Sequence, residues 1–123
     1  MDKIDIGILG ENAAVHHLEQ KGYNIIERNW RAGKLEVDII AQKDNFLIFI
    51  EVKTRSDNFL RSPESAVNSR KQNNIINAAR YYISRYNRTE EARLDVITVL
   101  HHNGEVISLT HYENAYFPRP RRF

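Results

Sequence analysis

Phe46-Leu-Ile-Phe-Ile-Glu-Val-Lys53 is the segment of this 123-residue sequence that decides the fold. Side chains alternate along a β-strand, so the even-numbered residues form one face and the odd-numbered residues the other. Both faces are apolar as far as Ile50, which is typical of a central strand that is covered on both sides. Glu51 and Lys53 continue a buried face, where an unpaired charge is costly. Either the sheet opens to solvent there, or a partner charge or a metal ion holds these side chains, and both alternatives predict a site.

The preceding segment, Leu35 to Gln42, is a second apolar strand, and the short polar turn Lys43-Asp44-Asn45 joins the two as an antiparallel hairpin. Asp38 lies on this strand, with Glu36 two residues earlier on the same face. An antiparallel partner would bring Asp38 or Glu36 beside Glu51. These carboxylates are therefore predicted to meet at one rim of the sheet.

Carboxylates beside a lysine suit phosphodiester hydrolysis. Mg²⁺ takes one or two protein carboxylates and fills its other positions with water and phosphate, and such an ion lowers the pKa of bound water. Lys53 would stabilise charge that develops on the phosphorus centre. A bare Glu-x-Lys is common, and its plainer interpretation is a salt pair that closes a strand. The order of carboxylate, turn, buried strand and Glu-x-Lys favours the site.

The remaining elements are expected on either side of this hairpin. A first helix is predicted from Asp5, as N-cap, to Lys21, with Gly22 at the C′ position, and a strand from Tyr23 to Arg31. Ser62-Pro63-Glu64 is a helix-start signal, and the helix it begins is expected to end near Tyr86.

A second hairpin is expected from Leu94 to Leu109, around the turn His102-Asn103-Gly104-Glu105. The strand–helix–strand unit from Phe46 to Leu100 should cross over right-handedly, which makes its strands parallel. The predicted fold is therefore α/β, a mixed sheet of about five strands flanked by two main helices, in the order α-β-β-β-α-β-β. It occupies residues 1–117 as one domain, followed by a basic tail at 118–123.

The motifs in this order resemble the bacterial YraN-like family. The resemblance rests on Gly10-Glu11, Asn29-Trp30-Arg31, Glu36-Val37-Asp38-Ile39-Ile40-Ala41 and Phe49-Ile50-Glu51-Val52-Lys53-Thr54-Arg55, and continues through Ala66-Val67, Lys71, Ala78-Ala79 and Arg93-Leu94-Asp95-Val96. That family is similar to the PD-(D/E)XK, or restriction-endonuclease-like, nucleases and especially to archaeal Holliday-junction resolvases.

This resemblance implies a catalytic set of Asp38, Glu51, Lys53 and, from the first helix, Glu11. It further implies Mg²⁺ or Mn²⁺ held by Asp38, Glu51 and Glu11, a DNA substrate and, by analogy, a homodimer. The sequence departs from the pattern at Leu35, where the family usually has glycine, and at Val37, where the superfamily's name has proline.

Four basic residues are candidates for nucleic-acid binding: Arg31, Arg55, Arg61 and Lys71. Lys71 could equally lay its stem along the apolar helix face. Glu11 could instead be an acid favoured by the helix dipole. Trp30, flanked by basic residues, could stack on a base, although core packing is its commoner role. The five histidines lack a metal-ligand spacing and are interpreted as surface or core residues.

The bulk composition excludes some classes of protein. The absence of cysteine excludes disulfides and thiolate metal sites. No apolar run approaches the ~20 residues that span a bilayer, and no secretory signal is recognisable, so a cytoplasmic protein without a membrane partner is expected. The net charge of +2 is weak evidence for a nucleic-acid partner. Arg119, Arg121 and Arg122 form a solvated terminus or attract phosphate.

The predicted function is a metal-dependent endonuclease or resolvase that hydrolyses DNA phosphodiester bonds, with branched or damaged DNA as substrate. The alternative is a non-catalytic nucleic-acid-binding module that retains the nuclease fold. A protein-interaction domain that uses no metal is the third interpretation.

Overall fold

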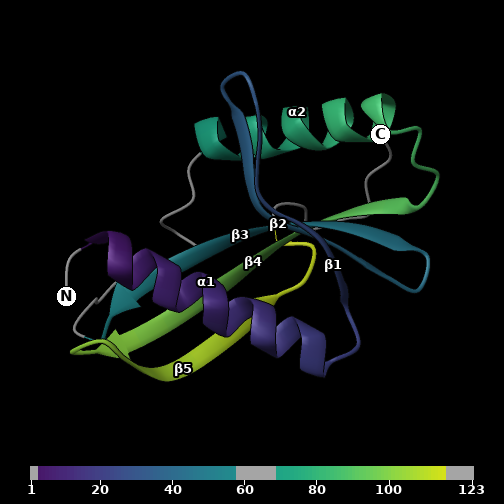
Figure 1. The fold of residues 1–123 in the computed structure, drawn as a ribbon. Coiled ribbons are helices and arrows are strands. Elements are labelled where there is room, and N and C mark those ends of the chain that lie inside the picture. The colour runs from purple at the N-terminus through teal and green to yellow at the C-terminus, as the bar shows by residue number, and fades with distance from the viewer. Residues whose placement is uncertain (1–2, 58–68, 116–123) are drawn as a thin grey trace.

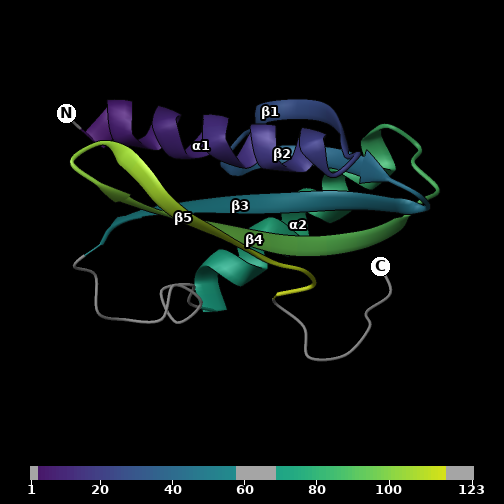
Figure 2. The same cartoon turned by 90° about the horizontal axis from the view of Figure 1, so that it is seen from below.

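A computed structural model describes residues 3–57 and 69–115 of the chain, and these residues form two helices on either side of one five-stranded sheet (Figures 1 and 2). The predicted α/β fold and its order of elements are confirmed. None of the helices in these ranges is long and apolar enough to cross a membrane. In chain order the elements are α1 (Lys3–Gln20), β1 (Asn24–Ala32), β2 (Leu35–Lys43), β3 (Phe46–Ser56), α2 (Ser69–Arg85), β4 (Glu91–His102) and β5 (Glu105–Tyr112).

The strands lie in sequence order across the sheet, with β3 at its centre. β3 and β4 are parallel and the other neighbouring pairs are antiparallel, as the crossover predicted. Ile48 and Ile50 of β3 pack on the α1 side, whereas Leu47 and Phe49 pack on the α2 side, and all four are fully buried. The central strand is therefore covered on both faces, as its sequence indicated.

The chain turns at residues that tolerate left-handed backbone. Asp44 (φ 53°) begins the β2–β3 turn, and Asn103 (φ 49°) with Gly104 (φ 83°) forms the β4–β5 turn. Gly22 (φ 87°) ends α1 in a Schellman motif, in which Tyr23 N–H donates to Leu18 O and Gly22 N–H to Glu19 O. The local turn signals of the sequence are thus used as expected.

Three helix boundaries differ from the expectation or lie outside the described residues. The expectation that Asp5 caps α1 is wrong, because the helix already includes Lys3 and Asp5 lies in its first turn. An acid is stabilised at that place by the helix dipole without being the cap. The predicted start of α2 at Ser62-Pro63-Glu64 lies outside the described residues, while its end at Arg85 falls one residue before the predicted Tyr86.

The β1–β2 hairpin bends where Asn29 faces Asp38. Arg28 pairs with Ile39 and Trp30 with Val37, so the register places Asn29 opposite Asp38. Asn29 has a left-handed backbone (φ 51°), which asparagine tolerates better than most residues. Val37 and Ile40 pack in the same α2-side core although strict alternation would put them on opposite faces. The hairpin beyond this point is therefore rotated, and Figure 1 shows it turning up past α2.

A network of buried charged groups surrounds Asp95 of β4 on the α1 side of the sheet. Arg93 donates to both Asp95 oxygens, His111 Nε2 lies 2.7 Å from Oδ2, and Asn114 N–H donates to Oδ1. Burial alone would raise the pKa of Asp95, but the hydrogen bonds from His111 and Arg93 outweigh it and hold this pKa below its usual range. Because every partner is itself part of the sheet or its turn, this cluster is structural support for β4 and β5.

Gly10 lets α1 lie directly on β3. A Cβ atom built on Gly10 would stand 1.9 Å from Thr54 Oγ1 and 3.0 Å from Thr54 Cβ, whereas one built on Gly7 meets nothing within 4 Å. Rotation about χ1 of Thr54 cannot relieve the contact with its Cβ. The next residue after Gly10 is Glu11, so this close approach also fixes where Glu11 sits above the sheet.

We expect Gly10→Ala to lower the free energy of unfolding by about 1–2 kcal/mol, because overpacking outweighs the gain in helix propensity. Gly7→Ala is the matched control in the same helix and should stabilise the protein by up to about 1 kcal/mol. Adding Thr54→Ala to Gly10→Ala should recover part of the loss. Urea unfolding followed by circular dichroism measures all three, and equal effects at residues 7 and 10 would contradict the close packing.

Candidate active site

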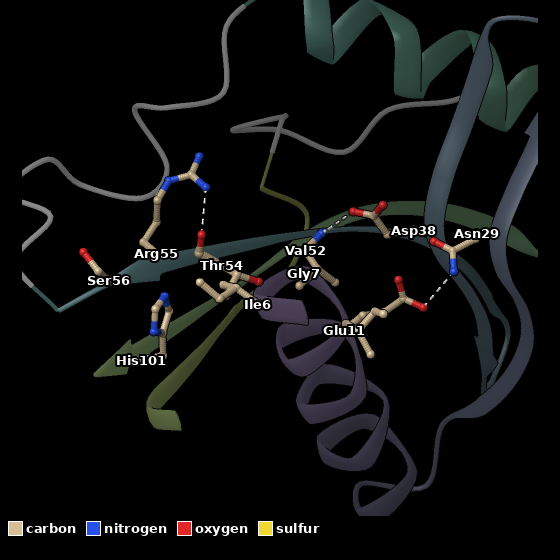
Figure 3. A pocket seen from close by; sticks show the side chains of 11 residues that line it. Ile6, Gly7, Glu11, Asn29, Asp38, Val52, Thr54, Arg55, Ser56 and His101 are labelled. Carbon is tan, nitrogen blue, oxygen red and sulfur yellow. Dashed lines mark hydrogen bonds between the residues drawn. The ribbon is translucent and has the colours of Figure 1, made fainter. Parts of the chain in front are cut away.

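The pairing of β2 with β3 stops immediately before Asp38. The last paired residues are Ile39 and Ile50, and beyond them the strands diverge. At the next position the Asp38 carboxylate takes the place of a backbone partner, since Oδ2 accepts a hydrogen bond of 2.8 Å from Val52 N–H. This bond fixes the carboxylate in the gap between the two strands (Figure 3).

The environment of Asp38 opposes its ionisation. Burial is the largest cause and raises the pKa of Asp38 from the ordinary 3.8 to about 6. The hydrogen bond from Val52 N–H acts in the opposite direction, while the negative charges of Glu51, Glu11 and Glu36 raise the pKa further. Asp38 therefore lies where acidic side chains from α1, β2 and β3 converge.

Glu51 and Lys53 form an ion pair beside this gap. Lys53 Nζ lies 2.7 Å from Glu51 Oε1, and the Lys53 residue is only 6% exposed. The sequence left open whether solvent, a partner charge or a metal ion accommodates these two charges. The structure shows a partner charge, because Glu51 and Lys53 pair with each other. The pair places an ammonium group and a carboxylate on the α2 side of the strand that carries Val52.

A small cavity of about 110 Å³ joins Asp38 to Glu51 on the α2 side of the sheet. Asp38 and Glu51 thus meet at one rim, as the hairpin predicted. Glu36 also lines this cavity, but its side chain is 63% exposed and pairs with Arg31 at 3.3 Å. The complete lining consists of Lys34, Glu36, Val37, Asp38, Glu51, Asn74 and Ile75.

Glu11 faces Asp38 from the other side of the sheet. It lines a larger cavity of about 680 Å³ together with Asp38 and Asn29, but without Glu51 (Figure 3). Glu11 Oε1 accepts hydrogen bonds from Arg28 Nε at 3.0 Å and Asn29 Nδ2 at 3.1 Å. The structure therefore divides the predicted set, with Glu51 and Lys53 on one side of Asp38 and Glu11 on the other.

The donor set fits a cation held by two carboxylates. Within residues 3–57 and 69–115, no three histidine, aspartate or glutamate side chains are grouped closely enough to hold one metal ion. Mg²⁺ needs only one or two carboxylates, and Asp38 with Glu51 supplies two at one cavity. In the described part of the chain the three other acids near Asp38 are each paired with a basic side chain: Glu51 with Lys53, Glu11 with Arg28 and Glu36 with Arg31. The partner of Asp38 there is an uncharged N–H group.

The structure describes the side chains of two of the predicted nucleic-acid-binding residues, Arg55 and Arg31. Arg55 lines the large cavity and donates to Thr54 O, whereas Arg31 is an exposed residue of β1 that pairs with Glu36. Arg61 and the side chain of Lys71 lie outside the described residues, as does the basic tail. Trp30 is 8% exposed and packs in the α2-side core, which supports its structural interpretation.

Sequence reasoning gave no specific role to two residues that line the large cavity, Asn29 and His101. Asn29 did carry a signal, because asparagine is one of the residues that most often adopt a left-handed backbone. His101 carried none, since its place in the cavity follows from the parallel register that sets it beside Ser56.

Comparison with known proteins places most of the chain in one family. A sequence profile of the family described as uncharacterised protein family UPF0102 matches residues 10–99. A UPF0102 protein of Bacteroides thetaiotaomicron is 42% identical over 114 residues, which cover 93% of each chain. Relatives bearing the same name from Porphyromonas gingivalis and Flavobacterium johnsoniae are 41% and 40% identical over 116 residues. These alignments cover 94% and 92% of this chain, and 86% and 94% of the relatives.

We expect Asp38→Asn to stabilise the metal-free protein above pH 6. The raised pKa means that the folded protein retains a proton at pH values where the unfolded chain has lost it. Stability due to this group therefore falls as pH rises from about 4 to about 6 and stays low above that. Asparagine keeps an acceptor for Val52 N–H without the charge, and the gain should be at most about 3 kcal/mol.

Thermal unfolding of both proteins at pH 3.5 to 8, with a chelator present, measures this difference. The gain in melting temperature should be present at pH 7.5 and absent at pH 3.5. A gain that is constant with pH, or a loss at pH 7.5, would contradict the raised pKa.

Proposed function

The chain belongs to the UPF0102 family, and we propose that it is a metal-dependent nuclease that hydrolyses phosphodiester bonds in DNA, with branched or damaged DNA as substrate. The observation that carries this proposal is the gap between β2 and β3. There, the Asp38 carboxylate is fixed by Val52 N–H beside the Glu51–Lys53 pair. A carboxylate that is raised in pKa and lies at a cavity among other titratable groups is a typical feature of a functional site.

The chain's own residues have distinct roles in this proposal. Asp38 and Glu51 would hold Mg²⁺ or Mn²⁺, which when bound supplies Lewis acidity and lowers the pKa of a water molecule. Lys53 would donate to the phosphate oxygen on which negative charge develops. Val52 N–H keeps Asp38 oriented. Glu11, held by Arg28 and Asn29, would orient water on the α1 side.

The second candidate is a DNA-binding module without catalysis, and the close Glu51–Lys53 contact favours it. At 2.7 Å these two groups satisfy each other, and a buried pair of this kind has a structural role in many proteins. This function would be selected if the wild-type protein bound DNA without cutting it and the Glu51→Gln/Lys53→Met double variant still bound DNA.

We expect the purified protein to cut branched or nicked DNA with Mn²⁺ or Mg²⁺, and the Glu51→Gln/Lys53→Met variant to be at least about 100-fold slower. The double variant removes both charges together, because removal of one partner would leave a buried unpaired charge and destabilise the fold. Glu36→Gln is the matched control, an exposed acid of the same rim that the proposal does not use, and it should retain wild-type rates. Gel assays over four-way, flap, nicked and single-stranded substrates test this.

The proposal would be overturned if the wild-type protein cut none of these substrates with either metal. Equal rates in the wild type and the double variant would likewise assign any cleavage to a contaminating enzyme.

We expect Mn²⁺ at millimolar concentration to raise the melting temperature of the wild-type protein by a few degrees at pH 7.5, because a ligand that binds only the folded state stabilises it. The increase should be lost in Asp38→Asn and retained in Glu36→Gln. Differential scanning calorimetry with and without chelator measures it. An increase of the same size in Asp38→Asn would place the cation elsewhere.

A further inference from the structure

The large cavity has two chemically different ends. Figure 3 shows Asp38, Asn29 and Glu11 at one end and Arg55, Ser56 and His101 at the other. β3 connects the ends, because Val52 donates to Asp38 and Ser56 pairs with His101. Four residues of strand separate these two positions, which corresponds to about 13 Å at a rise of roughly 3.3 Å per residue.

His101 presents a hydrogen-bond donor at the far end. The residue is 8% exposed, and its Nδ1 atom is buried without a hydrogen-bond partner. A proton on Nδ1 of the neutral ring would leave a buried donor unsatisfied, which is costly. The neutral imidazole therefore carries its proton on Nε2, where it can donate to a ligand.

The other groups at this end are also suited to an anion. Arg55 contributes a guanidinium group and Thr54 and Ser56 contribute hydroxyl groups to the lining, and none of the cavity's acids lies at this end. Ile6 and Ile8 of α1 add apolar side chains to the lining of this cavity. Phosphate oxygens only accept hydrogen bonds, so this end favours a phosphate. At the other end Glu11 is paired with Arg28, and the ionised Asp38 carboxylate repels a phosphate unless a cation is bound.

We propose that the His101–Arg55 end is a subsite for a second backbone phosphate of the DNA strand whose scissile phosphate lies at Asp38. The inference rests on the proposed function and specifies what the strand contacts away from the bond that is cut. A neighbouring cavity of about 410 Å³ shares Ile6, Ser56 and His101 and extends to the β4–β5 turn. Its lining also includes Asp57, whose carboxylate lies 3.0 Å from His102 Nδ1.

The test is the affinity of the full chain for a fluorescent 12-nucleotide single strand, measured by anisotropy in EDTA so that no cleavage occurs. His101→Ala should bind about tenfold more weakly, as expected for a lost hydrogen bond to a charged group. His101→Gln, which retains a donor, should recover most of the affinity. His16→Ala is the matched control, an exposed histidine of α1 outside the cavity, and should bind like the wild type.

Two further measurements identify the ligand as phosphate. Arg55→Ala should reduce the slope of log affinity against log salt by about 0.7, the value for one phosphate contact on a single strand. The tenfold effect of His101→Ala should persist on a strand of the same length whose nucleotides at the subsite are abasic. An effect that disappears on the abasic strand would assign the subsite to a base and overturn the proposal.

Equal affinity of His101→Ala and the wild type would also overturn the phosphate subsite. If His101→Ala fails to fold, the affinity of His101→Gln and the salt slope of Arg55→Ala decide instead. The outcome is separable from that of the proposed function, because binding is measured without catalysis. A His101-dependent affinity in a protein that cuts nothing would reject the nuclease and keep the phosphate subsite. Cleavage with unchanged affinity in the His101 and Arg55 variants would do the reverse.

Discussion

The hydrogen bond from Val52 N–H to the Asp38 carboxylate is the interaction on which the arrangement of the site depends. In an uninterrupted ladder this N–H would bind the backbone of β2, but the bend at Asn29 and Asp38 takes that backbone away. A backbone donor inside a sheet is expensive to leave unpaired. Asp38 satisfies it with a side chain, so the carboxylate is held between β2 and β3 by a bond that the fold itself requires.

The same geometry explains why Asp38 is the most strongly perturbed acid of this rim. Burial is the largest cause of the raised pKa of Asp38, and the charges of Glu51, Glu11 and Glu36 raise it further. In the described residues each of these three acids has a lysine or an arginine within 3.3 Å. Asp38 has only an uncharged donor there, so its ionised form is the least compensated charge in the group. A divalent cation would relieve this imbalance, whereas a further carboxylate ligand would increase it. This favours a metal bound by few carboxylates and several waters.

The sequence predicted the parts of the fold that local chemistry determines. Asp44 and the Asn103-Gly104 pair marked two of the three hairpins, Gly22 marked the end of α1, and β3, which is apolar on both faces, required cover on both sides. The hairpin register also brought Asp38 beside Glu51. The sequence did not predict that Glu11 lies on the opposite side of Asp38 from Glu51. This placement depends on the bend at Asn29 and on the contact between Gly10 and Thr54, which are 44 positions apart in the chain. The Asp5 cap was wrong because an acid in the first helical turn and an N-cap acid give the same local signal.

Asp38 links two cavities that the sheet would otherwise separate. Of these two cavities in the described part of the chain, Glu51 lines the small one on the α2 side and Glu11 the large one on the α1 side, whereas Asp38 lines both. A sheet with complete pairing is closed to side chains from the opposite face, so this shared position exists only because β2 leaves β3 at residue 38. A polymer lying in the large cavity would therefore meet, at this gap, a cation held by Asp38 and Glu51. The bend in the hairpin, which sequence periodicity cannot reveal, is what would make the acidic rim accessible to a long substrate.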